Sequence, residues 1–362
     1  MTRCFATVAA LCLSLAVPAQ AGGDLIGPAP TPPSAAEMAF YAAPAQRVDV
    51  GGRSINLYCI GDGARTLLFE AGGSDWSIIW ALVQPRMGDG YRACAYDRAG
   101  MGFSDPSPWP RTPIAIVEDM HAMVTAAALP KPLILIGHSL GGFNAKLYAA
   151  LYPEDVAALI LVDPSEENAD ARGGAYLRQI LGDRAAARSE LMDASFLNWL
   201  MDRYRQCAGA AAAGPMDPAS ALYRRCTDPA RPILGEAAAR IRQNIQITPA
   251  YQQAQASEIL NSIYGDSRNN ALYARLFQPN MLGSRPLIVL THGDFDSGDP
   301  ADRADHLVMT ALHQETARLS ERGQQLQVDH AGHNIELDRP DAVIAAIRAT
   351  DAMLRADEAH RP

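Results

Sequence analysis

The chain has 362 residues, a formal net charge of −9 and 48% hydrophobic residues, which is enough to build a large apolar core. It carries no basic stripe, and this argues against a nucleic-acid-binding protein. Beyond the N-terminal segment no apolar stretch is long enough to cross a bilayer, so we expect no stable membrane insertion. These properties leave the oligomeric state open.

The N-terminal residues have the pattern of an export signal. Arg3 is followed by an apolar stretch over residues 5–17 and by the small-x-small sequence Ala19-Gln20-Ala21. This predicts a signal peptide over 1–21 and a periplasmic or extracellular protein, with a retained N-terminal anchor as the alternative. Residues 22–47 are rich in proline and alanine and predict an extended leader with one short helix near 35–41.

Eight short apolar runs predict strands, and apolar helical patterns separate most of the later ones. The predicted strands cover residues 48–50, 54–60, 66–70, 92–96, 133–136, 158–162, 287–290 and 325–329. Strands that alternate with helices favour an α/β fold, here a mostly parallel eight-stranded sheet flanked by helices. The two closely spaced strands at the start indicate an antiparallel hairpin at one edge.

Four cysteines remain once the signal peptide is set aside. Cys59 and Cys94 lie in predicted strands, whereas Cys207 and Cys226 flank an alanine-rich tract at 208–213 that we expect to be a loop. An exported chain with an even count permits disulfides, and we predict the pairs Cys59–Cys94 and Cys207–Cys226, with four buried thiols as the alternative. The spacing shows no metal-binding cysteine or histidine pattern, so neither a metal nor a cofactor is expected.

The most informative motif follows the apolar run at 133–136. Gly137-His138-Ser139-Leu140-Gly141 is a Gly-x-Ser-x-Gly sequence, and a helix-compatible stretch comes directly after it. Strand, sharp turn and helix would raise the Ser139 hydroxyl clear of the sheet, with the backbone N–H of Leu140 facing a developing oxyanion. Ser139 is therefore the predicted nucleophile. The alternative is a plain strand-to-helix turn with a capping serine.

Residues 165–283 interrupt the alternation of strands and helices. They are rich in alanine, arginine and glutamine at helical spacing and contain few strand candidates. We expect a helical cap inserted into an α/β core that comprises 48–164 and 284–356. Such a cap would cover the carboxyl edge of the sheet, where open α/β folds bind ligands. A helical layer without a role in substrate binding is the alternative.

A serine hydroxyl needs a base to become a nucleophile at neutral pH, and His333 is the predicted base. It follows a predicted strand, and an imidazole can accept the serine proton and return it to a leaving group. We expect His330 to be structural and His138 to shape the turn around the serine. The carboxylate that orients the base is either Asp163 or Asp296, because each follows a predicted core strand.

Three segments together resemble the α/β-hydrolase superfamily, and specifically its capped, exported bacterial serine hydrolases. They are the serine turn at 137–141, the sequence Tyr96-Asp97-Arg98-Ala99-Gly100-Met101-Gly102-Phe103-Ser104-Asp105, and the histidine segment at 329–340. The resemblance implies a serine hydrolase fold without identifying a substrate, because this fold supports many reactions.

The resemblance also bears on two site residues. It implies that Gly73, in the loop after the third strand, is the second backbone donor to the oxyanion. Most members carry the acid where Asp296 lies, but the exported bacterial members that this chain resembles slightly favour Asp163.

The predicted function is hydrolysis of a carboxylic ester, or a related acyl bond, of a small-molecule substrate through an acyl-serine intermediate. A proline-iminopeptidase-like aminopeptidase is the first alternative, although the chain lacks the Gly-Gly-Pro-Gly loop typical of that group. The second alternative is a receptor or binding module that keeps the fold without catalysis.

Overall fold

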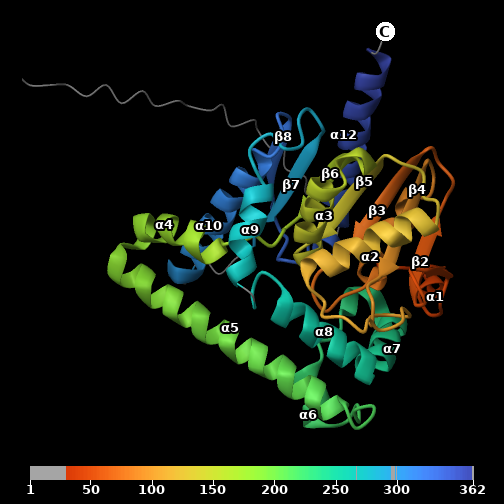
Figure 1. The fold of residues 1–362 in the computed structure, drawn as a ribbon, viewed down its shortest axis with the longest axis horizontal. Coiled ribbons are helices and arrows are strands. Elements are labelled where there is room, and N and C mark those ends of the chain that lie inside the picture. Colours follow the sequence, from red (N-terminus) through yellow and green to blue (C-terminus); the bar gives the residue numbers. More distant parts are fainter. Residues whose placement is uncertain (1–29, 266, 295–297, 299, 361–362) are drawn as a thin grey trace, which may run out of the picture.

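Eight strands form one sheet through the middle of the molecule (Figure 1). The computed structural model describes residues 30–265, 267–294, 298 and 300–360, so the predicted signal peptide and the start of the leader lie outside the described residues. The strands are β1 (Gln46–Asp49), β2 (Ser54–Ile60), β3 (Arg65–Glu70), β4 (Tyr91–Asp97), β5 (Leu133–His138), β6 (Val156–Val162), β7 (Leu287–His292) and β8 (Gly323–Val328). All eight predicted strands are confirmed.

The strands are ordered β1-β2-β4-β3-β5-β6-β7-β8. β1 pairs with β2 and β2 with β4 in antiparallel fashion, while every pairing from β4 to β8 is parallel. The mostly parallel sheet and the antiparallel hairpin at one edge are therefore confirmed. Because β5, β6, β7 and β8 are parallel, the loops that follow them all lie at the same carboxyl edge.

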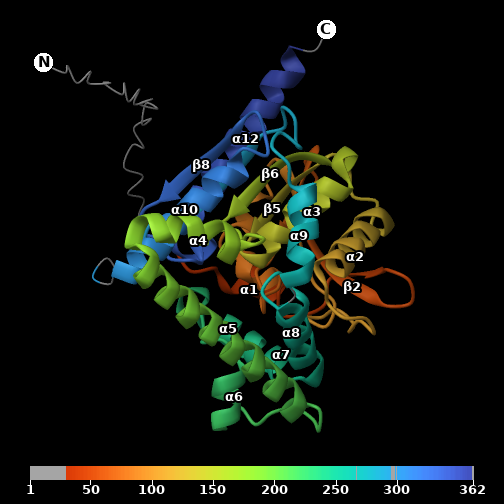
Figure 2. The ribbon, with the colours of Figure 1, turned by 60° about the vertical axis from the view of Figure 1, so that its left-hand side comes forward.

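Helices cover both faces of this sheet (Figures 1 and 2). One face carries α2 (Pro113–Ala126), α3 (Leu140–Leu151) and the end of α10 (Pro300–Ala317), and the other carries α12 (Pro340–Ala359). Successive residues of β5 divide between the two cores, since Leu133 and Leu135 face α3 whereas Ile134 and Ile136 face α12. This continuous apolar run is what a strand buried on both faces requires. The short helices α1 (Ala35–Phe40) and α11 (Ile335–Asp338) complete the core.

In the described part of the chain, six α-helices lie between β6 and β7. They are α4 (Ala169–Leu181), α5 (Asp183–Ala211), α6 (Ala221–Cys226), α7 (Gly235–Gln246), α8 (Pro249–Asn261) and α9 (Ser267–Leu276), hereafter the helical insertion. Figures 1 and 2 show α5, α6, α7 and α8 standing together beyond one end of the sheet. The prediction of a loop at 208–213 is partly wrong, because α5 continues to Ala211. Alanine has the highest intrinsic helix propensity, and the tract extends a helix that has already begun.

Both predicted disulfides are present. Cys59 and Cys94 are directly opposed on the antiparallel strands β2 and β4, and Cys207 and Cys226 join α5 to α6. The second bridge therefore closes the far end of the helical insertion. Within the residues that the structure describes, none of the helices combines the length and apolarity needed to cross a membrane.

Candidate active site

Ser139 occupies a strained turn between β5 and α3. Its backbone has φ 52° and ψ −123°, a conformation that non-glycine residues rarely adopt. The turn is possible because Gly137 and Gly141 lack side chains: a Cβ on Gly141 would lie 2.4 Å from the carbonyl oxygen of Ala71, and one on Gly137 would lie 2.4 Å from that of Gly141. The geometry is that of a nucleophile elbow.

His333 lies in the loop that follows β8, and Asp163 lies at the end of β6. The Nδ1 atom of His333 donates a hydrogen bond to Oδ2 of Asp163 at 2.6 Å. The imidazole is half exposed (52%) whereas the carboxylate is buried (3%). The imidazole is therefore accessible from solvent, and its hydrogen bond to the buried carboxylate fixes its orientation.

Asp163 also holds a second histidine, which the sequence analysis did not select. His292, the last residue of β7, donates its Nδ1–H to Oδ2 at 2.8 Å and its backbone N–H to Oδ1 at 3.1 Å. Burial alone would raise the pKa of Asp163, but the hydrogen bonds from His292 and His333 hold it well below its usual value. The Asp163 hydrogen bond in turn raises the pKa of His292. Asp296 lies outside the described residues.

Two further histidines lie near the elbow and in the loop that carries His333. His138 is buried behind the elbow, and its Nε2–H donates to the carbonyl oxygen of His333 at 2.9 Å. Burial lowers the pKa of His138 to about 3, so this side chain is neutral. Its hydrogen bond stabilises the loop that carries His333. His330 is exposed and has φ 59°, so its backbone helps to shape that loop.

The loop after β3 passes directly against the elbow. A Cβ on Gly72 would lie 2.9 Å from Nδ1 of His138, and one on Gly73 would lie 3.6 Å from the Leu140 side chain. Leu140 is the first residue of α3, where backbone N–H groups have no partner within the helix. The structure thus brings the two predicted oxyanion donors, Gly73 and Leu140, into neighbouring positions.

Arg98 fixes this loop, a function that the sequence analysis did not assign. Its buried guanidinium donates to the carbonyl oxygens of Ala71 at 2.6 Å, Gly72 at 2.7 Å and Asp75 at 3.2 Å. It also pairs with Glu258 of α8 at 2.7 Å. One cation therefore connects this loop, residues 70–75 (hereafter the oxyanion loop, after its predicted role), to the helical insertion.

A second buried ion pair makes the same connection. Arg242 of α7 pairs with Asp75, and both side chains are almost completely buried. Burial would raise the pKa of Asp75, but Arg242 and the nearby Arg231 lower it, so the carboxylate stays charged. In addition, Tyr251 of α8 donates its hydroxyl to the carbonyl oxygen of Ser74 at 2.9 Å. The loop at 70–75 is consequently fixed by Arg98 of the core and by Arg242 and Tyr251 of the helical insertion.

The Ser139 hydroxyl is 3.5 Å from the hydroxyl of Ser165, its side-chain hydrogen-bond partner in the described structure. The hydrogen bond from Ser139 to His333 that a catalytic triad uses is not formed here. Such hydrogen bonds are often long before substrate binds. Ser165 in turn contacts Tyr264 of the insertion at 2.5 Å. Neither residue has a motif that would have selected it.

Asp163, His292 and His333 are the described residues whose side chains could hold a metal ion, with ligand atoms within 4.8 Å of one another. Their Nδ1 to Oδ2 separations of 2.6 and 2.8 Å are those of hydrogen bonds. Ligands around a tetrahedral zinc with bonds of about 2.0 Å lie roughly 3.3 Å apart. The cluster is therefore arranged for sharing protons rather than for a bound ion.

Comparison with known proteins identifies the family of the chain. A family model for the alpha/beta hydrolase fold matches residues 65–340, which is more than half of the chain, so the chain belongs to the α/β-hydrolase family. It is similar in structure to a putative lipase from Acinetobacter baumannii AYE, with a TM-score of 0.57 and 20% identity over 89% of this chain and 95% of that one. It is also similar to a thermophilic esterase from Thermogutta terrifontis, with a TM-score of 0.52 and 19% identity over 86% of this chain and 99% of that one. At these identities the likeness shows the fold alone.

In sequence, the chain is 30% identical over 129 residues to a 2-(acetamidomethylene)succinate hydrolase from Mesorhizobium japonicum. That match covers 36% of this chain and 46% of the relative. The chain spans less than half the length of the curated relatives that it matches.

Proposed function

We propose that the protein is a serine hydrolase that cleaves a carboxylic ester through an acyl-serine intermediate. The observation that carries this proposal is the 2.6 Å hydrogen bond between His333 and Asp163, behind a serine held in an elbow. A hydroxyl, an imidazole and a buried carboxylate from three adjacent loops are what nucleophilic acyl transfer needs. An ester is favoured over an amide because an alkoxide is the better leaving group.

In this mechanism His333 takes the proton of Ser139 as the hydroxyl oxygen attacks the carbonyl carbon. The negative charge of the tetrahedral intermediate is stabilised by the N–H groups of Leu140 and Gly73, each worth about 3 kcal/mol. Asp163 stabilises the imidazolium, which then gives its proton to the leaving alcohol. Water repeats the sequence on the acyl-serine and releases the acid.

Asp163 rather than Asp296 is the proposed acid, because its carboxylate already orients His333. We expect Asp163→Asn to lower kcat by about 10⁴-fold, as the loss of the acid does in serine triads. Asp296→Asn is the matched control and should retain most of the activity. Equal losses in the two variants would contradict the assignment.

The helical insertion (165–283) is proposed to act as a cap on the core formed by 48–164 and 284–356. Its contacts with the oxyanion loop support this role. We also propose that the protein is exported after removal of residues 1–21. The two disulfides support export, because such bonds persist in oxidising compartments.

The first experiment is labelling of the mature protein with a fluorophosphonate probe, which reacts only with an activated serine. We expect labelling in the wild type and none in Ser139→Ala, together with hydrolysis of aryl esters by the wild type alone. The rates with esters of increasing acyl length would then measure the size of the acyl pocket. A folded wild-type protein that neither reacts with the probe nor hydrolyses any ester would refute the proposed function and favour a binding module.

A further inference from the structure

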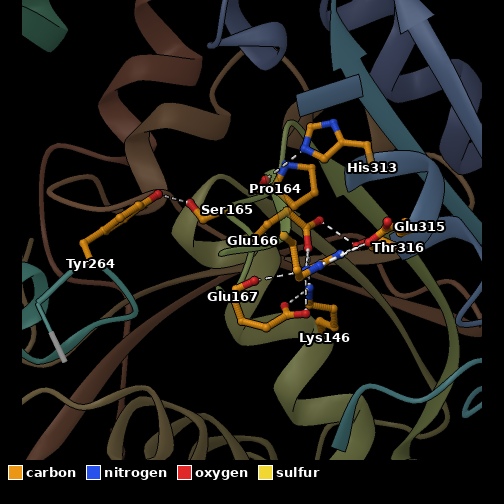
Figure 3. Close-up of polar contacts among 10 residues, drawn as sticks. Lys146, Pro164, Ser165, Glu166, Glu167, Tyr264, His313, Glu315 and Thr316 are labelled. Atoms are coloured by element: carbon orange, nitrogen blue, oxygen red, sulfur yellow. Dashed lines mark hydrogen bonds and ion pairs between the residues drawn. The ribbon is translucent and has the colours of Figure 1, made fainter. Parts of the chain in front are cut away.

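Two hydroxyl groups beside the nucleophile have no part in the mechanism described above. Ser165 Oγ lies 3.5 Å from Ser139 Oγ and 2.5 Å from the Tyr264 hydroxyl. Figure 3 shows the contact between Ser165 and Tyr264. Ser165 belongs to the segment that follows β6, whereas Tyr264 comes from the turn between α8 and α9. A side chain of the helical insertion is thus separated from the nucleophile by a single hydroxyl.

The backbone of the segment 164–167 is fixed next to the elbow. The Ser165 N–H donates to the carbonyl oxygen of Ser139 at 3.0 Å. The carbonyl oxygen of Pro164 accepts a hydrogen bond from Nε2 of the buried His313 at 3.0 Å. Both contacts fix the backbone position of Ser165 next to the serine turn at 137–141.

Buried charges fix the same segment from its other end (Figure 3). Lys146, on the helix that begins at the elbow, donates to Glu166 at 2.9 Å and to Glu167 at 2.7 Å. Burial would lower the pKa of Lys146, but the two glutamates raise it and keep the ammonium charged. Thr316 also donates to Glu166 at 2.6 Å, and Arg172 to Glu167 at 2.7 Å. The backbone that carries the Ser165 hydroxyl is therefore held in place before substrate arrives.

The sheet order determines on which side of Ser139 these hydroxyls lie. β5 carries Ser139 and lies between β3, which leads to the oxyanion loop, and β6, which leads to Asp163 and Ser165. A carbonyl oxygen directed at Gly73 lies on the β3 side of Ser139, so the β6 side stays open to another substituent of the tetrahedral carbon. His333 is on that side too, through its hydrogen bond to Asp163. The leaving-group oxygen must be within reach of His333, so it lies on the side of the Ser165 hydroxyl.

We propose that Ser165 donates a hydrogen bond to the leaving-group oxygen and that Tyr264 positions the Ser165 hydroxyl for this purpose. The inference rests on the proposed ester hydrolysis and adds a catalytic residue to it. As the carbon–oxygen bond breaks, its electron pair moves to the alkoxide oxygen, which the Ser165 hydroxyl stabilises. The proton that completes the alcohol still comes from His333, so Ser165 and Tyr264 keep their own protons.

Tyr264 suits this task because its phenol stays protonated. Desolvation raises its pKa above the usual value, and the hydrogen bond with Ser165 only partly opposes that shift. A protonated Tyr264 can donate to Ser165 Oγ, which directs the Ser165 proton toward the substrate. The insertion would thereby influence the reaction directly as well as cover the site.

The test compares esters that share one acyl group and differ in the leaving group, from 4-nitrophenol to phenol to ethanol. A hydrogen bond to the departing oxygen matters most when the leaving group is a poor one. We expect Ser165→Ala to lower kcat/KM for the ethyl ester about tenfold more than for the 4-nitrophenyl ester, which corresponds to one hydrogen bond. Tyr264→Phe should change the ratio in the same direction by a smaller factor, and Ser165→Thr, which keeps a hydroxyl, should largely restore it.

Two matched controls remove hydroxyls elsewhere in the insertion. They are Tyr223→Phe on α6 and Ser195→Ala on α5, and neither should change the ratio. An unchanged ratio in both Ser165→Ala and Tyr264→Phe, in a protein that still reacts with the fluorophosphonate probe, would overturn this inference and leave the proposed function intact. A wild-type protein that does not react with the probe would overturn both.

Discussion

Arg98 offers the sharpest test of how the oxyanion loop is held. Its guanidinium reaches six oxygen atoms, namely both of Glu258, one of Glu70 and three carbonyl oxygens of the loop at 71–75. In Arg98→Lys the positive charge remains, but an ammonium donates at most three hydrogen bonds. Six acceptors less three donors means that at least three of these buried hydrogen bonds are lost, although Glu70 Oε1 still accepts from Asn144 and the Gly72 carbonyl oxygen from the Asp75 N–H. At about 1–3 kcal/mol each, we expect the free energy of unfolding to fall by about 3–5 kcal/mol.

The same substitution should slow catalysis. The lost hydrogen bonds allow the peptide groups on either side of Gly73 to move. The N–H of Gly73 then no longer stays directed at the oxyanion. Loss of one such donor costs about 10²–10³-fold in kcat, and we expect a decrease of about 10²-fold for Arg98→Lys. KM should change much less, because the donor acts mainly on the transition state.

Urea unfolding followed by circular dichroism measures the first effect, and initial rates with an aryl ester measure the second. The matched control is Arg240→Lys, since Arg240 is 68% exposed and its ion-pair partner among the described residues is Glu236 on its own helix. That variant should stay within about 0.5 kcal/mol of the wild type. An Arg98→Lys protein with unchanged stability and unchanged kcat would refute the reasoning.

Three further predictions concern stability. Burial lowers the pKa of His138 from 6.5 to about 3, so between these pH values the unfolded chain binds a proton that the folded chain does not. Stability should therefore fall as pH falls through this window, by at most about 1.4 kcal/mol per pH unit, and His138→Gln should show a correspondingly flatter profile of unfolding free energy against pH. Lys146→Met should lower the free energy of unfolding, measured in urea, by about 3–5 kcal/mol, because the buried Glu166 and Glu167 lose the cation that they share. A decrease below about 1 kcal/mol would contradict this. Replacing Cys207 and Cys226 by serine should lower the thermal unfolding midpoint through loss of about 3 kcal/mol, and a reducing agent should then have less effect than on the wild type.

The sequence predicted the sheet well because each strand is a short apolar run between polar turns. Runs such as 133–136 must be buried on both faces, and that requirement places helices on either side. The convergence of Ser139, Asp163 and His333 at one edge follows from the same fact, because parallel strands end together. The three segments that resemble the family then indicated which residue at each strand end to choose as a candidate site residue.

The supporting residues could not be predicted in this way. Arg98 lies in a recognised segment, but its partner Glu258 is on α8, 160 positions away. His292 ends a strand as Asp163 does, yet only the packing of β6 against β7 shows that the two side chains meet. Tyr264 reaches the site through the path of the insertion, and helical periodicity does not determine that path.

The two buried ion pairs divide the helical insertion into a rigid part and an adaptable part. Arg98–Glu258 and Asp75–Arg242 anchor α8 and α7, so these helices cannot swing away without separating charges inside the protein. Among the described residues, no buried ion pair fixes the middle of α5, and none of the α5 residues between Ser189 and Tyr204 is buried. If the insertion is displaced when the proposed cap admits a substrate, that motion should therefore be confined to the middle of α5. A designer who wished to change what the proposed hydrolase accepts would exchange that stretch and leave α7 and α8 untouched.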